Sequence, residues 1–352
     1  MEQKKITIFD VAKRAGVSKG TVDRVLHNRG EVSKKSADKV REAIKDLNYE
    51  PNMYASLLAT KKNREIACLI PKFKAGEYWS KIYDGIVAGK EYAETFNVEI
   101  AYFFYDQYDP DSFVEASQKL LKSNPSGVII PPLFRQLTSD FVMELKERDI
   151  PYVYVDTKLE EGSYLAYFGM PMYKSGYLCA NLLTARRKES EVKEILIVRI
   201  LRDKSSLSDP TIARRSGFID YIDTYFPECV VYSLFINPQD KESINKTLGD
   251  FYKKHPGIKN IVMFNSRVYL IADFLKQHPD ADRCVIGYDN LDANMSALRQ
   301  GVVSALLSQH TEFQSRNAVI ALTDYVVVKK QPQNRDCYMH TDILTALNME
   351  NY

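Results

Sequence analysis

Aromatic residues that could bind a small polar molecule follow the first short apolar run of the sequence. The loop after residues 66–70 carries Phe73, Tyr78 and Trp79, the only tryptophan of the chain. An aromatic ring at the mouth of a cleft could stack on the apolar face of a sugar. A tryptophan here could equally anchor the next helix to a sheet, so both roles of Trp79 stay open.

Charged and amide side chains follow the later apolar runs in the same way. Asp106, Arg135, Asp156, Asn265 and Asp289 each come just after one of these runs. If the runs are parallel strands, their carboxyl ends meet at one edge of a sheet, where such folds bind ligands. Carboxylate and amide groups pair well with vicinal hydroxyls. Asp156 could also merely cap a turn, and this alternative stays open.

Three common catalytic and cofactor-binding motifs are missing. The chain has no Gly-x4-Gly-Lys-Ser/Thr loop, no Gly-x-Gly-x-x-Gly and no His-Glu-x-x-His. Its five cysteines, at 68, 179, 229, 284 and 337, lack the spacing of a metal site or a disulfide framework, so we interpret them as reduced core residues. The sequence therefore predicts a binding protein with no catalytic residue, metal or cofactor.

The first sixty residues have the pattern of a helix-turn-helix. Thr7 can cap a first helix together with Asp10, and Gly16 can end that helix in a left-handed conformation. Ser18 can then cap a second helix, and Ser33 a third. A second helix free to enter a major groove favours nucleic-acid binding over a helical hairpin that binds nothing.

Charge and periodicity divide the chain into a headpiece and a core. Residues 1–62 hold 14 Lys and Arg against 8 Asp and Glu, whereas the whole chain has a net charge of only +2. A basic end suits contact with DNA. From residue 64 onward, apolar strands alternate with amphipathic helices, which predicts doubly wound parallel sheets in two lobes. No run is long enough to span a membrane, and the N-terminus lacks a signal peptide, so we expect a cytoplasmic, nucleoid-associated protein.

The headpiece residues resemble those of the lactose-repressor/galactose-repressor (LacI/GalR) family of bacterial transcription regulators. The resemblance is dense over the first sixty residues and looser through the rest of the chain. The matching residues are Thr7 to Ala12, Ala15 to Ser18, Thr21, Val22, Arg24, Val25, Val32, Ser33, Val40, Leu47 to Tyr49, Pro51, Asn52, Ala55, Leu58 and Ala59.

The resemblance implies a fold and its boundaries. A small all-α helix-turn-helix headpiece at 1–50 and a hinge at 51–63 would precede a two-lobed α/β core at 64–352, of the type I periplasmic-binding-protein kind. The first lobe would comprise about 64–160 and 304–329. The second would comprise about 163–290 and 335–345.

The resemblance also implies which residues contact DNA. The full set is Thr7, Ser18, Lys19, Gly20, Thr21, Arg24, Arg29, Ser33, Lys34, Asn52, Ala55 and Leu58. Lys19, Gly20 and Arg24 would face the groove, and Leu58 would wedge between base pairs of the minor groove unless it only packs on the next domain. Gly20, Asp23 and Met53 depart from the usual residues, which leaves the sequence preference open.

In the core, the resemblance implies an effector site between the lobes. Arg214 belongs to an Arg-x-x-Gly-aromatic segment, and Asn265 and Asp289 match ligand-contacting positions. Their alternatives are a surface salt bridge for Arg214 and a strand-end cap for Asp289. The complete predicted set is Phe73, Tyr78, Trp79, Asp106, Arg135, Tyr173, Arg214, Asn265, Asp289 and Gln309.

The predicted function is sequence-specific control of transcription, as a repressor of carbohydrate metabolism genes. The expected partners are a sugar or sugar derivative, a near-palindromic double-stranded operator and a second copy of the chain, with no membrane. Two alternatives stay open: a carbohydrate-processing enzyme with a DNA-binding appendage, and a constitutive DNA-binding protein with a vestigial cleft.

Overall fold

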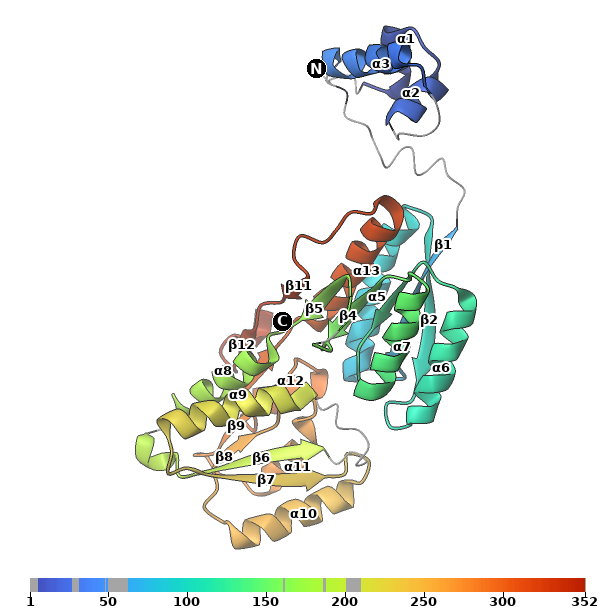
Figure 1. Cartoon of the computed structure of the whole chain (residues 1–352). Helices are drawn as coiled ribbons and strands as arrows, with labels where there is room; N and C mark the ends of the chain where they lie inside the picture. Colours follow the sequence, from blue (N-terminus) through green and yellow to red (C-terminus); the bar gives the residue numbers. More distant parts are fainter. Residues whose placement is uncertain are drawn as a thin grey trace. The chain divides into compact units, whose positions relative to one another are not determined.

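The three-dimensional structure is a computed structural model that describes residues 6–26, 32–47, 49, 63–160, 162–185, 188–200 and 210–351. The chain divides into two compact units, Met1–Lys61 and Lys62–Tyr352 (Figure 1). The division between the units falls inside the predicted hinge.

The described part of the first unit contains three short helices. They are α1 (Ile8–Ala15), α2 (Lys19–Leu26) and α3 (Lys34–Asp46). The backbone N–H and the hydroxyl of Thr7 both donate to Asp10 Oδ2, at 2.8 and 2.7 Å, which fixes the beginning of α1. Gly16 ends this helix with φ of +65°, a conformation that costs glycine little. The helix-turn-helix predicted from the sequence is therefore confirmed.

Small and β-branched residues fill the space between these helices. The buried set is Val11, Ala12, Ala15, Val22, Val40 and Ala43. An ion pair between Arg14 and Asp46 also joins α1 to α3, but both side chains are exposed and such pairs add little stability. Apolar packing is therefore what holds this small unit together.

The first lobe of the second unit is built on a six-stranded parallel sheet. Its strands are β1 (Arg64–Pro71), β2 (Val98–Tyr105), β3 (Gly127–Ile130), β4 (Tyr152–Asp156), β5 (Ala166–Gly169) and β11 (Asp336–Tyr338), in the order β11-β5-β4-β3-β1-β2. Helices cover both faces: α5 (Tyr78–Glu94) and α13 (Thr311–Val328) on one, α6 (Pro110–Ser123) and α7 (Arg135–Glu147) on the other (Figure 1). The inner strands β1, β3, β4 and β5 are therefore mostly apolar and buried from both sides, whereas the edge strands β2 and β11 are partly exposed.

The second lobe repeats this architecture. Its strands are β6 (Glu194–Ile200), β7 (Val230–Ile236), β8 (Asn260–Val262), β9 (Cys284–Tyr288), β10 (Ala305–Ser308) and β12 (Asp342–Leu344), in the order β12-β10-β9-β8-β6-β7. Only β12 runs antiparallel to its neighbour. One core cluster packs under α8 (Met172–Thr184) and α9 (Pro210–Tyr225), and the other under α10 (Lys241–Lys254), α11 (Tyr269–Gln277) and α12 (Asp292–Arg299). Two short 3-10 helices, Glu189–Glu191 and Met349–Asn351, complete this lobe.

The lobe boundaries predicted from the sequence are wrong for three strands. β5 joins the first sheet although it falls within 163–290, and β10 joins the second sheet although it falls within 304–329. The segment 335–345 is also divided, because β11 joins the first sheet and β12 the second. A run of buried apolar residues predicts a strand, but it does not identify the sheet that the strand joins. The chain therefore passes between the lobes three times.

The five cysteines, all of them within the described residues, form no disulfide bond. Cys68, Cys179 and Cys284 are buried, whereas Cys229 and Cys337 are partly exposed and so are not full core residues. Among the described helices, none is both long and apolar enough to cross a bilayer.

Candidate functional site

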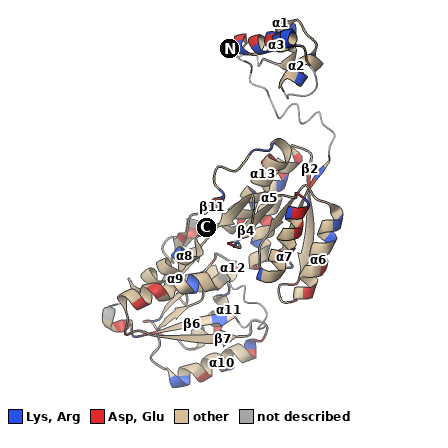
Figure 2. Cartoon of the chain, viewed as in Figure 1, with Lys and Arg blue, Asp and Glu red and all other residues tan. Residues whose placement is uncertain are grey.

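The second helix of the headpiece turns its polar residues away from the core. Val22 is fully buried, whereas Lys19, Gly20 and Arg24 are exposed. Figure 2 marks the lysine and arginine positions of the headpiece helices in blue. The Lys19 ammonium lies 4.8 Å from the centroid of the Phe9 ring, and Phe9 is 64% exposed. Phe9 therefore belongs to the same surface, although the sequence pattern did not single it out.

Several of the predicted DNA contacts are also caps of helices. Ser18 Oγ accepts from the backbone N–H of Thr21 at 3.2 Å and lies 3.0 Å from the Thr21 hydroxyl. Ser33 Oγ accepts from the backbone N–H three residues later, and Lys34 is exposed in the first turn of α3. These caps place helix N-termini at the surface, where backbone N–H groups can meet a phosphate. A contact of these residues, or of Thr7, with DNA stays a prediction.

Four predicted DNA contacts lie outside the described residues: Arg29, Asn52, Ala55 and Leu58.

Gly16, Ser18 and Gly20 have the Gly-x-Ser-x-Gly spacing of a nucleophile elbow. In that elbow the serine stands on a turn from a strand into a helix. Here it stands between two helices, and its hydroxyl caps the second of them. The spacing therefore carries no indication of catalysis.

In the second unit, buried polar side chains meet where strands of both sheets end. Asp156 ends β4, Asp289 follows β9 and Gln309 follows β10. Gln309 Nε2 donates to Asp289 Oδ1 at 2.8 Å, and its Oε1 accepts from Arg214 at 3.2 Å. Tyr78, in the first turn of α5, donates to Asp156 Oδ1 at 2.5 Å and accepts from Gln309 Nε2 at 3.1 Å. We call these five residues the cleft cluster; their role in binding an effector stays a prediction.

Arg214 is fixed within this cluster from several sides. It is only 4% exposed, donates to the Phe264 carbonyl at 2.8 Å and to the Met170 sulfur at 3.1 Å, and covers the Tyr288 ring at 4.3 Å. Gly176 lets α8 pass close to α9, because a Cβ at this position would lie 1.8 Å from the Arg214 carbonyl oxygen. A surface salt bridge, the alternative role considered for Arg214, is therefore ruled out, and its guanidinium is held rigidly at the lobe interface.

Two buried amides that support the cluster were missed by the sequence reasoning. Gln314 accepts from the Asp156 backbone N–H at 3.2 Å and donates to the Gln309 carbonyl at 2.7 Å. Asn294 donates to the carbonyls of Tyr288 and Asp289, both at 3.0 Å. Both amides lie in helices, where the sequence alone gives no sign that a particular polar residue faces inward. Among the described residues, no group of acidic, histidine and cysteine side chains is placed to hold a metal ion.

Burial raises the pKa of Asp289 to about 7, well above its ordinary value of 3.8. The Arg214 guanidinium and the hydrogen bond from Gln309 act in the opposite direction, and the Asp156 carboxylate adds to the increase. Asp289 also has a left-handed backbone, with φ of +67°, which an aspartate tolerates better than most residues. A buried carboxyl of this kind can exchange hydrogen-bond partners near neutral pH.

We expect this pKa to make stability depend on pH. Between about pH 4 and about pH 7 the folded Asp289 keeps a proton that the unfolded chain has lost, so rising pH favours unfolding. The free energy of unfolding of the wild type should therefore fall by about 2 kcal/mol more than that of Asp289→Asn when the pH rises from about 5 to about 8. Urea denaturation of both proteins across this range measures the difference. A difference that does not change with pH would contradict the raised pKa.

Trp79 and Asn265 lie near the cluster but are engaged in local contacts. Trp79 is 6% exposed, and its Nε1 donates to Gln107 at 3.4 Å. Of its two predicted roles, these contacts match the anchoring of α5. The Asn265 side-chain oxygen accepts from the Arg267 backbone N–H at 2.9 Å. Arg267 itself reaches the first lobe, where it donates to Gln107 and to the Tyr108 hydroxyl at 3.3 and 2.6 Å. These bonds form a second link between the lobes.

Asp106 and Phe73 are placed apart from the cleft cluster. Asp106 is exposed and accepts from the Tyr108 backbone N–H at 2.9 Å, so it caps a turn. Phe73 packs against Tyr83 and Phe104, with ring centroids 5.2 and 6.0 Å apart. The structure therefore does not bring these two residues into the cluster.

A cavity of about 520 Å³ adjoins the cluster where the loops after β3, β4 and β5 meet the beginnings of α8 and α9. Arg135 and Tyr173 both line it, together with the apolar segment 170–172. Met170, whose sulfur accepts from Arg214, belongs to this wall. Tyr173 also donates to Asp220 at 2.7 Å. Arg135 and Tyr173 thus face a space next to the cluster rather than the cluster itself.

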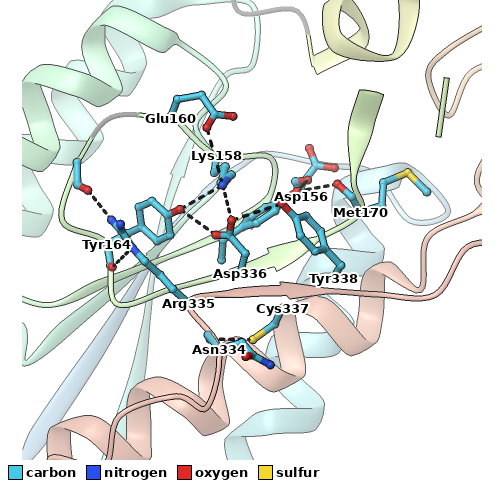
Figure 3. Close-up of polar contacts among 12 residues, drawn as sticks. Asp156, Lys158, Glu160, Tyr164, Met170, Asn334, Arg335, Asp336, Cys337 and Tyr338 are labelled. Carbon is cyan, nitrogen blue, oxygen red and sulfur yellow. Dashed lines mark hydrogen bonds and ion pairs between the residues drawn. The ribbon is translucent and has the colours of Figure 1, made fainter. Parts of the chain in front are cut away.

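A network of charged and aromatic side chains fixes β11 to the first lobe, close to the passage into the second (Figure 3). Lys158 donates to Asp336 Oδ2 at 2.6 Å and to the Tyr164 hydroxyl at 3.2 Å, and Arg335 lies 3.8 Å from the centroid of the Tyr164 ring. Although burial acts to raise it, the pKa of Asp336 is lowered overall by the hydrogen bonds from Lys158 and Tyr164. The ionised pair therefore holds this connection in place.

Comparison with known proteins agrees with this arrangement. Residues 7–52 match the family described as bacterial regulatory proteins, lacI family, and residues 66–330 match the periplasmic binding protein domain. A Bacteroides fragilis protein described as a LacI transcriptional regulator has a similar structure, with a TM-score of 0.77 and 34% identity over 83% of this chain and 100% of that chain. GanP, a glucose-galactose binding protein from Geobacillus stearothermophilus, shares the fold at a TM-score of 0.70 and 18% identity, over 82% of this chain and 99% of its own.

A curated relative matches over a shorter stretch. The ribose operon repressor of Lactococcus lactis subsp. lactis (strain IL1403) is 33% identical over 165 residues, which is 45% of this chain and 45% of the relative. The chain thus spans less than half the length of this relative. The extent of the domain match and the similarity to the Bacteroides protein are decisive: the chain belongs to the lacI family of bacterial regulatory proteins, with a periplasmic-binding-protein domain after its helix-turn-helix.

Proposed function

We propose that the protein represses genes of carbohydrate metabolism by binding operator DNA, and that a sugar or sugar derivative bound between the lobes controls this binding. The cleft cluster is the observation that carries the proposal. A headpiece that matches the lacI family supports the DNA-binding half of it. Repression of this kind takes place in the cytoplasm, on the nucleoid.

The cleft cluster suits a polyhydroxy ligand because it combines two carboxyls, a guanidinium and an amide within one buried space. Each ligand hydroxyl can donate to Asp156 or Asp289 and accept from Arg214 or Gln309. The Lactococcus relative is named for the ribose operon, and GanP for glucose and galactose. Control requires that the sugar bind one arrangement of the lobes better than another.

Thermal unfolding of the full chain tests directly whether a sugar binds the folded protein. A ligand that binds only the folded protein raises the unfolding midpoint as its concentration rises. The panel should include ribose, arabinose, glucose, galactose and their acids and polyols. A concentration-dependent increase with one of them would name the effector class, whereas no increase with any of them would remove sugars from the proposal.

Operator binding should depend strongly on salt, because lysine and arginine side chains of the headpiece would displace counterions from phosphates. We expect the affinity of the full chain for DNA selected from a random pool to fall by about a hundredfold or more between about 50 and 200 mM salt. Fluorescence anisotropy at several salt concentrations gives the slope. A flat salt response would contradict DNA binding by this surface.

We also propose that the protein is a homodimer on a near-palindromic operator, because one helix-turn-helix reads only a half-site. An aromatic surface on the first lobe suits this contact. Tyr83 of α5 and Tyr102 and Phe104 of the edge strand β2 lie together with Phe73, and Phe104 is 39% exposed. Exposed aromatic residues beside an unpaired strand edge are a common site of association.

Phe104→Glu should separate the dimer into monomers, because a carboxylate cannot be buried there without a partner. Light scattering of the eluted protein measures its mass. Met143→Glu, at a residue that is 60% exposed on α7, adds the same charge on the other face of the sheet and should leave the dimer intact. If Phe104→Glu stays dimeric, the contact lies elsewhere.

A further inference from the structure

The hydroxyl of Tyr78 lies at the centre of the cleft cluster and uses its full donor capacity inside the chain. It donates to Asp156 Oδ1 at 2.5 Å and accepts from Gln309 Nε2 at 3.1 Å. Asp156 belongs to the first lobe, whereas the same Gln309 amide binds Asp289 and Arg214 of the second. One phenol therefore connects the carboxylate of one lobe with the polar groups of the other.

The electrostatics of the site keep this phenol a donor. Burial raises the pKa of Tyr78 well above its ordinary value, and the carboxylates of Asp156 and Asp289 raise it further. The hydroxyl is therefore protonated at any physiological pH. It does what a hydroxyl of a polyol would do in the same place, because it accepts from an amide and donates to a carboxylate.

We propose that Tyr78 is an internal competitor of the effector: its hydroxyl holds Asp156 and Gln309 together until a ligand hydroxyl replaces it. This inference rests on the proposed function, because it assumes that the effector binds at the cleft cluster. The ligand must exchange hydrogen bonds with a group already in place rather than meet bare donors and acceptors. The apparent affinity for the ligand is then lower than the intrinsic affinity, because only the molecules in which Tyr78 has released the site can bind it.

Trp79 reports on this exchange. Its ring packs edge-to-face on Tyr78, with centroids 5.1 Å apart, and its Nε1 donates to the Gln107 oxygen that also accepts from Arg267 of the second lobe. The only tryptophan of the chain thus lies beside two of the hydrogen-bonded links between the lobes. Loss of the Tyr78 link should make this buried ring more accessible to a quencher.

The first test needs no ligand. Tyr78→Phe removes only the hydroxyl and keeps the ring on Trp79, so the fold should be retained. We expect the acrylamide quenching constant of Trp79 to rise about twofold or more, as the population shifts toward separated lobes. Tyr325→Phe, near the C-terminal end of α13, removes a hydroxyl away from the cleft cluster and should leave quenching unchanged. Equal quenching in Tyr78→Phe and the wild type would overturn the proposal.

The second test measures how the hydroxyl affects binding. Ribose, glucose and galactose are titrated into the wild type and Tyr78→Phe, and the unfolding midpoint is followed. A sugar that stabilises the wild type should do so at about tenfold lower concentration in Tyr78→Phe, since a hydrogen bond to a charged group no longer competes. A need for more sugar in the variant would make the hydroxyl a ligand contact and would refute competition. If no sugar raises the unfolding midpoint of either protein, the proposed effector class is wrong. The quenching result alone then tests whether the Tyr78 hydroxyl holds Asp156 and Gln309 together.

Discussion

Replacing Arg214 with methionine will abolish the response of the protein to its sugar while leaving DNA binding in place. The guanidinium is buried, binds Gln309, Met170 and the Phe264 carbonyl, and its charge acts on Asp289. Loss of hydrogen bonds from a buried charged group weakens binding by about a hundredfold or more. Calorimetric titration with the sugar that stabilises the wild type measures this loss.

The neighbouring arginine provides a matched control. Arg215 is less buried than Arg214, and Arg215→Met removes the same charge one residue away. Its sugar affinity should stay within about threefold of the wild type. If Arg214→Met binds the sugar as tightly as Arg215→Met does, the effector does not bind at the cleft cluster.

Replacing Arg24 with alanine will weaken operator binding at least tenfold and relax the preference for sequence. Arg24 is exposed on α2, on the side away from the buried Val22, where a side chain can reach a guanine edge. A lost bidentate contact costs about 1–3 kcal/mol at one base pair. Anisotropy titrations with the selected operator and with single-base variants of it measure both effects.

An exposed arginine on another helix of the headpiece serves as the control. Arg41 lies on α3, where it pairs with Asp38 at 3.2 Å. Arg41→Ala removes the same charge and should change operator affinity less than threefold. Equal losses in both variants would mean that net charge, rather than a base contact of Arg24, controls binding.

The fold of this chain was largely predictable because its strands and helices differ in local pattern. Thr7, Asp10 and Gly16 fix the ends of α1 through backbone bonds that depend only on nearby residues. The sheet membership of β5 and β10 was not predictable in this way. It depends on which long-range neighbour each strand pairs with, and two buried apolar runs look alike in sequence.

The site was predictable only in part, for a similar reason. Tyr78, Arg214, Asp289 and Gln309 come together because strand ends of parallel sheets share an edge. The roles of Asp106 and Asn265 as turn caps depend on backbone geometry that a residue type does not reveal. Gln314 was missed because its inward direction follows from how α13 packs, and a lone glutamine in a helix carries no sign of burial.

The most direct test of the central claim is the operator affinity of the full chain, measured by anisotropy with and without each sugar of the panel. If a sugar in the cleft controls DNA binding, at least one should change the dissociation constant about fivefold or more, and Arg214→Met should lose that change. Operator binding that no sugar of the panel alters, at concentrations that raise the unfolding midpoint, would contradict the account. The cleft would then bind sugar without controlling the headpiece.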